Sequence, residues 1–269
     1  MHACRVTGKY RPHGSFLPER CAGIEFVLLV GYTLFDKLDF NEKKEMLKVL
    51  KNFKGAIFDM DGTLIDSLML WNVLWDKFGE TFLKNESFRP SGEDDKAVRT
   101  MTLKDAMDYL HSVYGIGSCG EELLQTANAI IVDFYANEVE LKKGVAEFLE
   151  YCYANGVKMC VASATDMSLL KVAIEHCRIE KYFSDVFSCA EIGKGKDEPD
   201  IYLKALDCLG TRVEETYIFE DSHIAIKTAS GIGVNTVGIY DKFNYGQEEM
   251  KRIADVYIGE GETLLKLLG

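Results

Sequence analysis

Several short apolar runs in this sequence end in side chains that can act as acids, nucleophiles or metal ligands. The runs, each with the polar residues after it, are Gly55–Phe58 with Asp59 and Asp61, Val157–Ala162 with Ser163, and Thr216–Phe219 with Glu220 and Asp221. Because the carboxyl ends of parallel strands meet at one edge of a sheet, we expect these side chains to share a pocket.

Carboxylates gathered in such a pocket repel one another strongly when water does not screen them. A divalent cation between them would relieve the repulsion, and hard oxygen ligands suit Mg²⁺. The pattern therefore predicts a magnesium site formed by Asp59, Asp61, Glu220 and Asp221. The alternative is that each acid is a solvated strand end unrelated to the others.

The elements that must position these residues alternate along the chain. Further apolar runs lie at Thr236–Ile239, Asp255–Ile258 and around Val186–Phe187. Between the runs, helical spacing of apolar residues recurs, as in Leu170, Ala173, Ile174 and Cys177. Strands that alternate with amphipathic helices predict an α/β fold, with a Rossmann-like, doubly wound parallel sheet.

One stretch, residues 67–140, breaks the alternation because it contains no convincing strand. Its helical runs, Leu70–Phe82, Leu103–Tyr114 and Glu121–Tyr135, are separated by a polar loop over residues 85–96. An insertion at the carboxyl end of a strand hangs over the place where ligands bind in such folds. We predict an all-helical cap at 67–140 and an α/β core formed by 46–66 and 141–269.

Residues 1–45 are predicted to be an N-terminal extension of uncertain status. Basic residues precede the apolar run Phe26–Phe35, a weak resemblance to a signal peptide, but no small-residue cleavage site follows the run. The alternative to export is that translation begins at Met46, which would make residues 1–45 dispensable.

Composition narrows the classes of partner. The formal net charge is −12 without a basic stripe, so we expect neither nucleic acid nor a membrane as a partner. The eight cysteines form no C-x-x-C pair, which favours reduced thiols in a cytoplasmic protein. Both a monomer and a homodimer fit the sequence.

Four segments together resemble the motifs of the haloacid dehalogenase (HAD) superfamily. They are Phe58-Asp-Met-Asp-Gly-Thr-Leu64, Ser163 in Val161-Ala-Ser-Ala-Thr165, Lys196 in Gly195-Lys-Asp-Glu-Pro-Asp200, and Phe219-Glu-Asp-Ser222. They follow the family's order, and the resemblance covers about residues 52–260. The place of the helical insertion resembles subfamily I, which includes phosphatases and β-phosphoglucomutase-like enzymes.

The resemblance implies a mechanism and a role for each residue. Asp59 would attack phosphorus, and Asp61 would protonate the leaving alcohol and then activate water. Lys196 would neutralise developing charge. The residues expected to contact the substrate phosphate are Thr63, Ser163, Ala164 and Lys196. Magnesium would be held by Asp59, the backbone carbonyl of Asp61 and Asp221, with Glu220 as a ligand or as a neighbour of the ligands.

The predicted function is a Mg²⁺-dependent phosphatase that hydrolyses a small-molecule phosphomonoester through an aspartyl-phosphate. Dehalogenases of the family lack the second acid, so Asp61 points to phosphoryl transfer. Sugar phosphomutases share all four motifs but typically carry a cap histidine where this chain has Trp71. A mutase, and a catalytically silent phosphate-binding relative, remain as alternatives.

Overall fold

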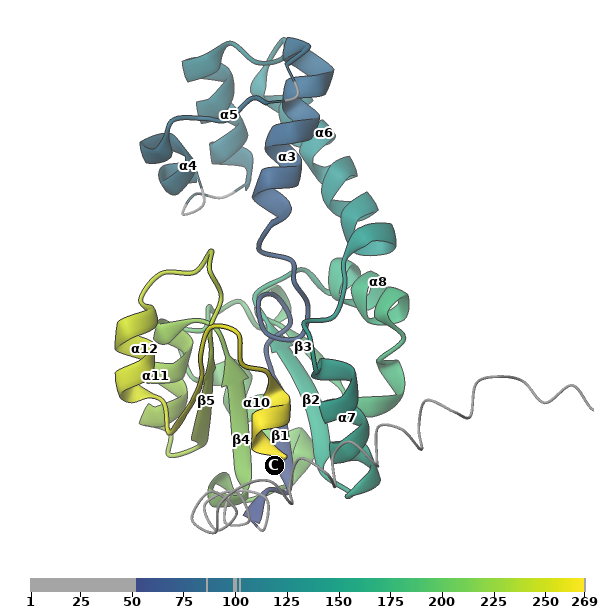
Figure 1. Ribbon diagram of the computed structural model, residues 1–269, viewed down its shortest axis with the longest axis vertical. Helices are drawn as coiled ribbons and strands as arrows, with labels where there is room; N and C mark the ends of the chain where they lie inside the picture. The colour runs from purple at the N-terminus through teal and green to yellow at the C-terminus, as the bar shows by residue number, and fades with distance from the viewer. Residues whose placement is uncertain (1–51, 86, 99–100, 102, 269) are drawn as a thin grey trace, which may run out of the picture.

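The centre of the fold is a parallel six-stranded sheet with strand order β3-β2-β1-β4-β5-β6 (Figure 1). A computed structural model describes residues 52–85, 87–98, 101 and 103–268, so the predicted extension 1–45 lies outside the described residues. The strands are β1 (Gly55–Phe58), β2 (Lys158–Ser163), β3 (Val186–Ser188), β4 (Thr216–Glu220), β5 (Asn235–Ile239) and β6 (Val256–Ile258). The predicted doubly wound parallel sheet is confirmed.

Helices cover both faces of this sheet and also form a group beyond its carboxyl edge. The helices are α3 (Leu70–Phe78), α4 (Gly92–Val98), α5 (Leu103–Tyr114), α6 (Gly120–Asp133), α7 (Val145–Ala154), α8 (Met167–Cys177), α9 (Cys189–Ile192), α10 (Asp200–Leu209), α11 (His223–Gly231) and α12 (Gln247–Ile253). Short 3₁₀ or π-helical segments are η1 (Gly79–Leu83), η2 (Phe134–Glu138), η3 (Glu180–Tyr182), η4 (Val213–Glu215) and η5 (Leu264–Leu267).

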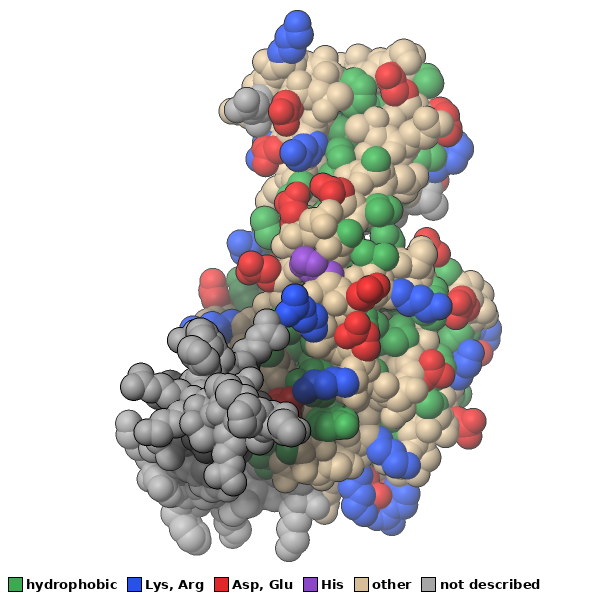
Figure 2. Space-filling view, turned by 90° about the vertical axis from the view of Figure 1, so that its right-hand side faces the viewer, with side chains coloured by type: hydrophobic (Ala, Val, Ile, Leu, Met, Phe, Trp, Pro, Cys, Tyr) green, Lys and Arg blue, Asp and Glu red, His purple; other side chains and the backbone are tan. Residues whose placement is uncertain are grey.

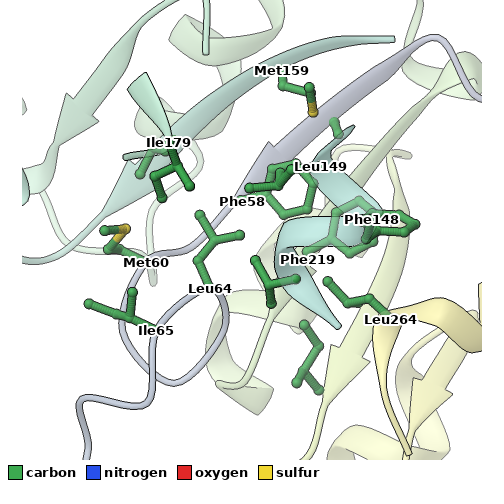
Figure 3. Close-up of a cluster of buried hydrophobic side chains, with 14 of the residues drawn as sticks. Phe58, Met60, Leu64, Ile65, Phe148, Leu149, Met159, Ile179, Phe219 and Leu264 are labelled. Carbon is green, nitrogen blue, oxygen red and sulfur yellow. The ribbon is translucent and has the colours of Figure 1, made fainter. Parts of the chain in front are cut away.

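Alternate residues of β1 belong to two separate apolar cores, one on each face of the sheet. Phe58 stacks on Phe219 with a centroid distance of 4.5 Å, and Phe148 of α7 meets both rings (Figure 3). On the other face, Ile57 belongs to the core that contains Tyr202 of α10. Every residue of β1 is buried, as expected of a central strand covered on both sides.

Helices α3, α4, α5 and α6, between β1 and α7, form a third core of their own. Trp75, Phe78 and Leu110 are buried in it, and Trp71 lies 5.4 Å from Trp75 between ring centroids. Figure 1 shows α3, α4, α5 and α6 beyond the carboxyl ends of the strands, and Figure 2 shows the molecule narrowing between them and the sheet. The division of the chain into core and cap domains stays a prediction.

The polar loop predicted over residues 85–96 is wrong from Gly92 onward, where α4 begins. The Ser91 hydroxyl accepts from the backbone N–H of Asp94 (3.2 Å), and the first turn is acidic, with Glu93, Asp94 and Asp95. A serine before acidic residues favours a helix N-terminus, because the carboxylates interact well with the helix dipole. The short helix shows too little apolar periodicity to be recognised by spacing.

The two chain crossings between the sheet and the outer helices lie side by side. Asp66 N–H donates to the Glu140 carbonyl and Lys142 N–H donates to the Leu64 carbonyl, both at 2.9 Å. Ile65 and Leu141 form an isolated antiparallel bridge between these bonds. Segment 67–140 therefore leaves and rejoins the sheet at one point.

A bilayer-spanning helix would need a long apolar run, and none of the helices in the described part of the chain has one. Within the same residues the cysteine thiols are unpaired, at positions 119, 152, 160, 177, 189 and 208.

Candidate active site

Asp59 lies directly after β1, at the middle of the sheet's carboxyl edge. Its backbone N–H donates to the Phe219 carbonyl at 3.0 Å, which fixes Asp59 beside the end of β4. Lys196, from the loop between α9 and α10, places its Nζ 2.6 Å from Asp59 Oδ1. The same ammonium group also bonds Glu220 Oε1, so one lysine is shared by two carboxylates.

Asp59, Glu220 and Asp221 form a cluster with carboxylate oxygens within 4.8 Å of one another. Their exposed fractions are 7%, 1% and 3%. Burial and the neighbouring carboxylates raise the pKa of Asp221 well above its usual range, and burial, opposed by the charge of Lys196, raises the pKa of Glu220 to about 7. Burial likewise raises the pKa of Asp59.

This cluster has the donor set that a hard divalent cation requires. Glu220 Oε1 accepts from Lys196 and from Tyr202 OH (2.9 Å), whereas its other oxygen, Oε2, is buried and has no hydrogen-bond partner in the described part of the chain. Asn244 Nδ2 donates to Asp221 Oδ2 at 2.8 Å and orients that carboxylate. Surplus negative charge and an unsatisfied buried oxygen both fit a Mg²⁺ ion.

Three hydroxyl groups hold the Asp61 carboxylate. Its Oδ1 accepts from Ser67 Oγ (2.6 Å) and from Tyr135 OH (2.5 Å), and its Oδ2 accepts from Thr165 Oγ1 (2.7 Å). Burial and the charge of Asp61 raise the pKa of Tyr135, so its hydroxyl stays protonated and donates. The acid is therefore fixed by residues from three different segments.

The turn after β1 depends on Gly62 and on Lys142. Gly62 has φ of +73°, and a Cβ there would lie 2.3 Å from Asp221 Oδ2. Lys142 Nζ bonds the Gly62 carbonyl (2.6 Å), the Tyr240 carbonyl (3.1 Å) and Asp241 Oδ2 (2.9 Å). The lysine thus ties the turn to the loop after β5, which also carries Asn244.

The predicted phosphate contacts occupy different positions around this centre. Ser163 ends β2 and is buried, with its Oγ accepting from Thr165 N–H at 3.1 Å, while Ala164 next to it is exposed. The Oγ1 of Thr63 is buried and has no hydrogen-bond partner among the described residues, and its phosphate contact stays a prediction. Backbone bonds such as Ile65 N–H to Met60 O (3.0 Å) close the turn.

The sequence profile described as "Haloacid dehalogenase-like hydrolase" matches residues 56–239 of this chain. The chain belongs to this family. The match begins within β1 and ends with β5, so it contains every site residue predicted from the sequence.

A curated relative and two solved structures resemble this chain over most of its length. A phosphorylated carbohydrates phosphatase of Thermotoga maritima is 24% identical over 217 residues, which cover 80% of this chain and 98% of that protein. The crystal structure of CbbY from Rhodobacter sphaeroides in complex with phosphate superimposes with a TM-score of 0.60 at 20% identity, covering 76% of this chain and 93% of that one. A Thermotoga maritima structure named as a candidate beta-phosphoglucomutase superimposes with a TM-score of 0.68 at 22% identity. The match covers 77% of this chain and 94% of that one.

Several residues that shape this HAD-family site were missed by the sequence reasoning. They are Tyr135, Lys142, Thr165, Tyr202 and Asn244. Thr165 was within reach, since it follows Ser163 by two positions at the end of a strand. The others lie on segments without a recognisable motif, so only their positions in the fold reveal them.

Proposed function

We propose that the protein is a Mg²⁺-dependent phosphatase that hydrolyses a small-molecule phosphomonoester through an aspartyl-phosphate on Asp59. The observation that supports this most is the Asp59 carboxylate, which bonds Lys196 at 2.6 Å beside a cluster of buried acids. This lysine neutralises one carboxylate oxygen, and the remaining acidic groups suit a cation that can attract a phosphate dianion.

In the first half-reaction, an Asp59 oxygen attacks phosphorus in line with the bond to the leaving oxygen. The new bond joins Asp59 to phosphorus while the phosphorus–alkoxide bond breaks, and the proton of the Asp61 carboxyl moves to the departing oxygen. Lys196 and the Ser163 hydroxyl hold phosphoryl oxygens as charge redistributes.

In the second half-reaction, water attacks the aspartyl-phosphate and gives a proton to the Asp61 carboxylate. The bond between phosphorus and Asp59 breaks, inorganic phosphate leaves, and both aspartates return to their starting states. One carboxyl group therefore serves first as acid and then as base, which requires it to remain in one place through both steps.

Asp59, Asp221 and the Asp61 carbonyl would hold the Mg²⁺ ion, with Glu220 either a ligand or a neighbour that holds Lys196. When bound, the ion supplies positive charge that offsets repulsion between the nucleophile and the phosphate.

Hydrolysis is proposed over a mutase because Trp71 stands where mutases typically carry a cap histidine. The likeness to a phosphatase named for phosphorylated carbohydrates makes sugar phosphates the first substrates to try. The cytoplasmic location and the monomeric or homodimeric state stay predictions.

Phosphate release from p-nitrophenyl phosphate and a panel of small phosphomonoesters tests the proposal. The assay would run with and without Mg²⁺ on wild type, on Asp59→Asn and on the matched control Asp207→Asn, an exposed residue of α10. We expect Mg²⁺-dependent release that is abolished in Asp59→Asn and unchanged in Asp207→Asn. A sugar-phosphate mutase assay runs alongside, and mutase turnover without phosphate release would contradict the proposal.

A further inference from the structure

The hydroxyl of Tyr135 contacts the predicted acid–base residue across a long stretch of chain. Tyr135 lies in η2, where the chain returns from the outer helices, 74 positions from Asp61, and its OH is 2.5 Å from Asp61 Oδ1. The side chain is 5% exposed, and its ring packs against Phe134 with a centroid distance of 5.9 Å. Because the ring is wedged in the core, the hydroxyl occupies a fixed point in space.

The other contacts of the Asp61 carboxyl come from short, rotatable side chains. Ser67 and Thr165 each hold one oxygen with a hydroxyl on a single rotatable bond. Within the described residues Asp61 belongs to no ion pair, whereas Asp59 is paired with Lys196. Tyr135 is therefore the most rigid of the groups that define where the Asp61 carboxyl points.

We propose that Tyr135 is a positioning residue for Asp61, whose carboxyl it holds in the orientation needed to protonate the leaving oxygen. This inference rests on the proposed phosphatase function. The role requires the hydroxyl and not the ring, since the ring fills the core and the hydroxyl alone contacts Asp61. It also explains a buried tyrosine hydroxyl that donates to a partly exposed acid rather than to backbone.

Tyr135→Phe removes the hydroxyl and keeps the packing, and Tyr217→Phe is the matched control, a buried tyrosine on β4. Both variants and wild type would be assayed with esters from p-nitrophenyl phosphate to alkyl phosphates. A nitrophenolate departs without a proton, but an alkoxide needs one from Asp61. A misplaced Asp61 therefore affects poor leaving groups most.

We expect kcat/KM of Tyr135→Phe on alkyl esters to fall about tenfold or more, the size of losing one hydrogen bond to a charged group. This ratio reports the steps up to departure of the alcohol and excludes the second half-reaction, which every ester shares. The loss should shrink as the leaving group improves, and Tyr217→Phe should match wild type. An equal loss on every ester, or none, would overturn the proposal, because a merely structural hydroxyl would not discriminate among leaving groups.

Crystal structures of wild type and Tyr135→Phe keep the test independent of turnover. We expect the Asp61 carboxyl to rotate away from its wild-type position in Tyr135→Phe. An unchanged Asp61 orientation in the variant would overturn the positioning role, whether or not wild type hydrolyses an ester. Failure of wild type to hydrolyse any ester would instead count against the proposed phosphatase function.

Discussion

A single residue, Lys196, offsets much of the negative charge of the site. Its side chain is 11% exposed and bonds both Asp59 and Glu220, which are 9% and 1% exposed as side chains. Burial alone would lower the pKa of this lysine, but the two carboxylates outweigh burial and raise it. The ammonium group stays charged, and each carboxylate depends on it.

Replacing Lys196 with Met should therefore lower the stability of the fold as well as catalysis. It leaves two buried carboxylates without their cation, and breaking a buried ion pair from one side costs about 3–5 kcal/mol. We expect urea denaturation of the metal-free protein to show a loss of this order. The matched control is Lys194→Met, whose partner is Asp200 on the surface, with side chains 51% and 36% exposed. An exposed pair contributes little to stability, so equal losses in the two variants would contradict this account.

Residue types and order were sufficient to predict the centre of the site but not the groups that surround it. Asp59, Glu220 and Asp221 each follow a strand, so sheet topology alone brings them together, and the structure does place them within 4.8 Å. Tyr202 and Asn244 act through hydrogen bonds to Glu220 and Asp221. Their reach depends on how α10 and the loop after β5 pack, and local patterns do not encode that.

The turn between β1 and the first crossing shows how one element constrains the site. Gly62 adopts a positive φ and lies against the Asp221 carboxylate, so the strand end, the turn and the acid cluster form one unit. Lys142, from the second crossing, holds the Gly62 carbonyl and extends this unit to the loop after β5.

Gly62→Ala should lose both stability and activity. A left-handed backbone costs a non-glycine residue about 1–2 kcal/mol, and the added methyl group would also displace Asp221 Oδ2, which lies 2.3 Å away. Gly156→Ala is the matched control, with φ of +72° and nothing within 4 Å of the added carbon. We expect urea denaturation to show a fall in the free energy of unfolding from backbone strain alone in Gly156→Ala, and a larger fall in Gly62→Ala. Only Gly62→Ala should weaken Mg²⁺ binding, measured by calorimetry, and unchanged Mg²⁺ affinity there would contradict this.

The spacing of apolar residues predicts the helices that pack on the sheet well, and it predicts the helices beyond the sheet poorly. Leu170, Ala173 and Ile174 of α8 are buried, as their spacing predicts, and Cys177 is half-buried. Helix α4 was missed because it is short and its N-terminal half is acidic, and the runs ending at Phe82 and Tyr135 finish in π-helical segments rather than in regular helix. Capping and tertiary contacts, not apolar spacing, determine those ends.

For the whole molecule, the acid cluster makes stability without metal depend on pH. The pKa of Glu220 is raised from 4.5 to about 7, so between these values the folded protein binds more protons than the unfolded chain. Stability without metal should therefore fall as pH rises through this range. The surface acid Glu215 has its pKa lowered to about 2 by Arg212 and Lys54, so its contribution changes only below about pH 4.5.

Thermal unfolding in a chelator should give a lower Tm at pH 8 than at pH 5.5. Mg²⁺ should raise Tm more at pH 8, because the ligands are then deprotonated and binding to the folded state adds stability. Asp221→Asn has one fewer carboxylate, so its Tm in the chelator should depend less on pH. Mg²⁺ should also raise its Tm by less than it raises that of wild type. A Tm that increases with pH in the chelator would contradict the raised pKa values.

The paired crossings have a consequence for how this protein can be altered. Because the Asp66 N–H bonds the Glu140 carbonyl and the Lys142 N–H bonds the Leu64 carbonyl, the stretch between them is an insert whose two ends lie side by side after β1. A foreign helical module with closely spaced termini could be spliced there without re-routing any strand. Asp59 and the acid cluster lie outside the exchanged stretch, so exchanging it offers a way to change substrate preference. The new module would need a tyrosine at the position of Tyr135 to keep the Asp61 carboxyl oriented.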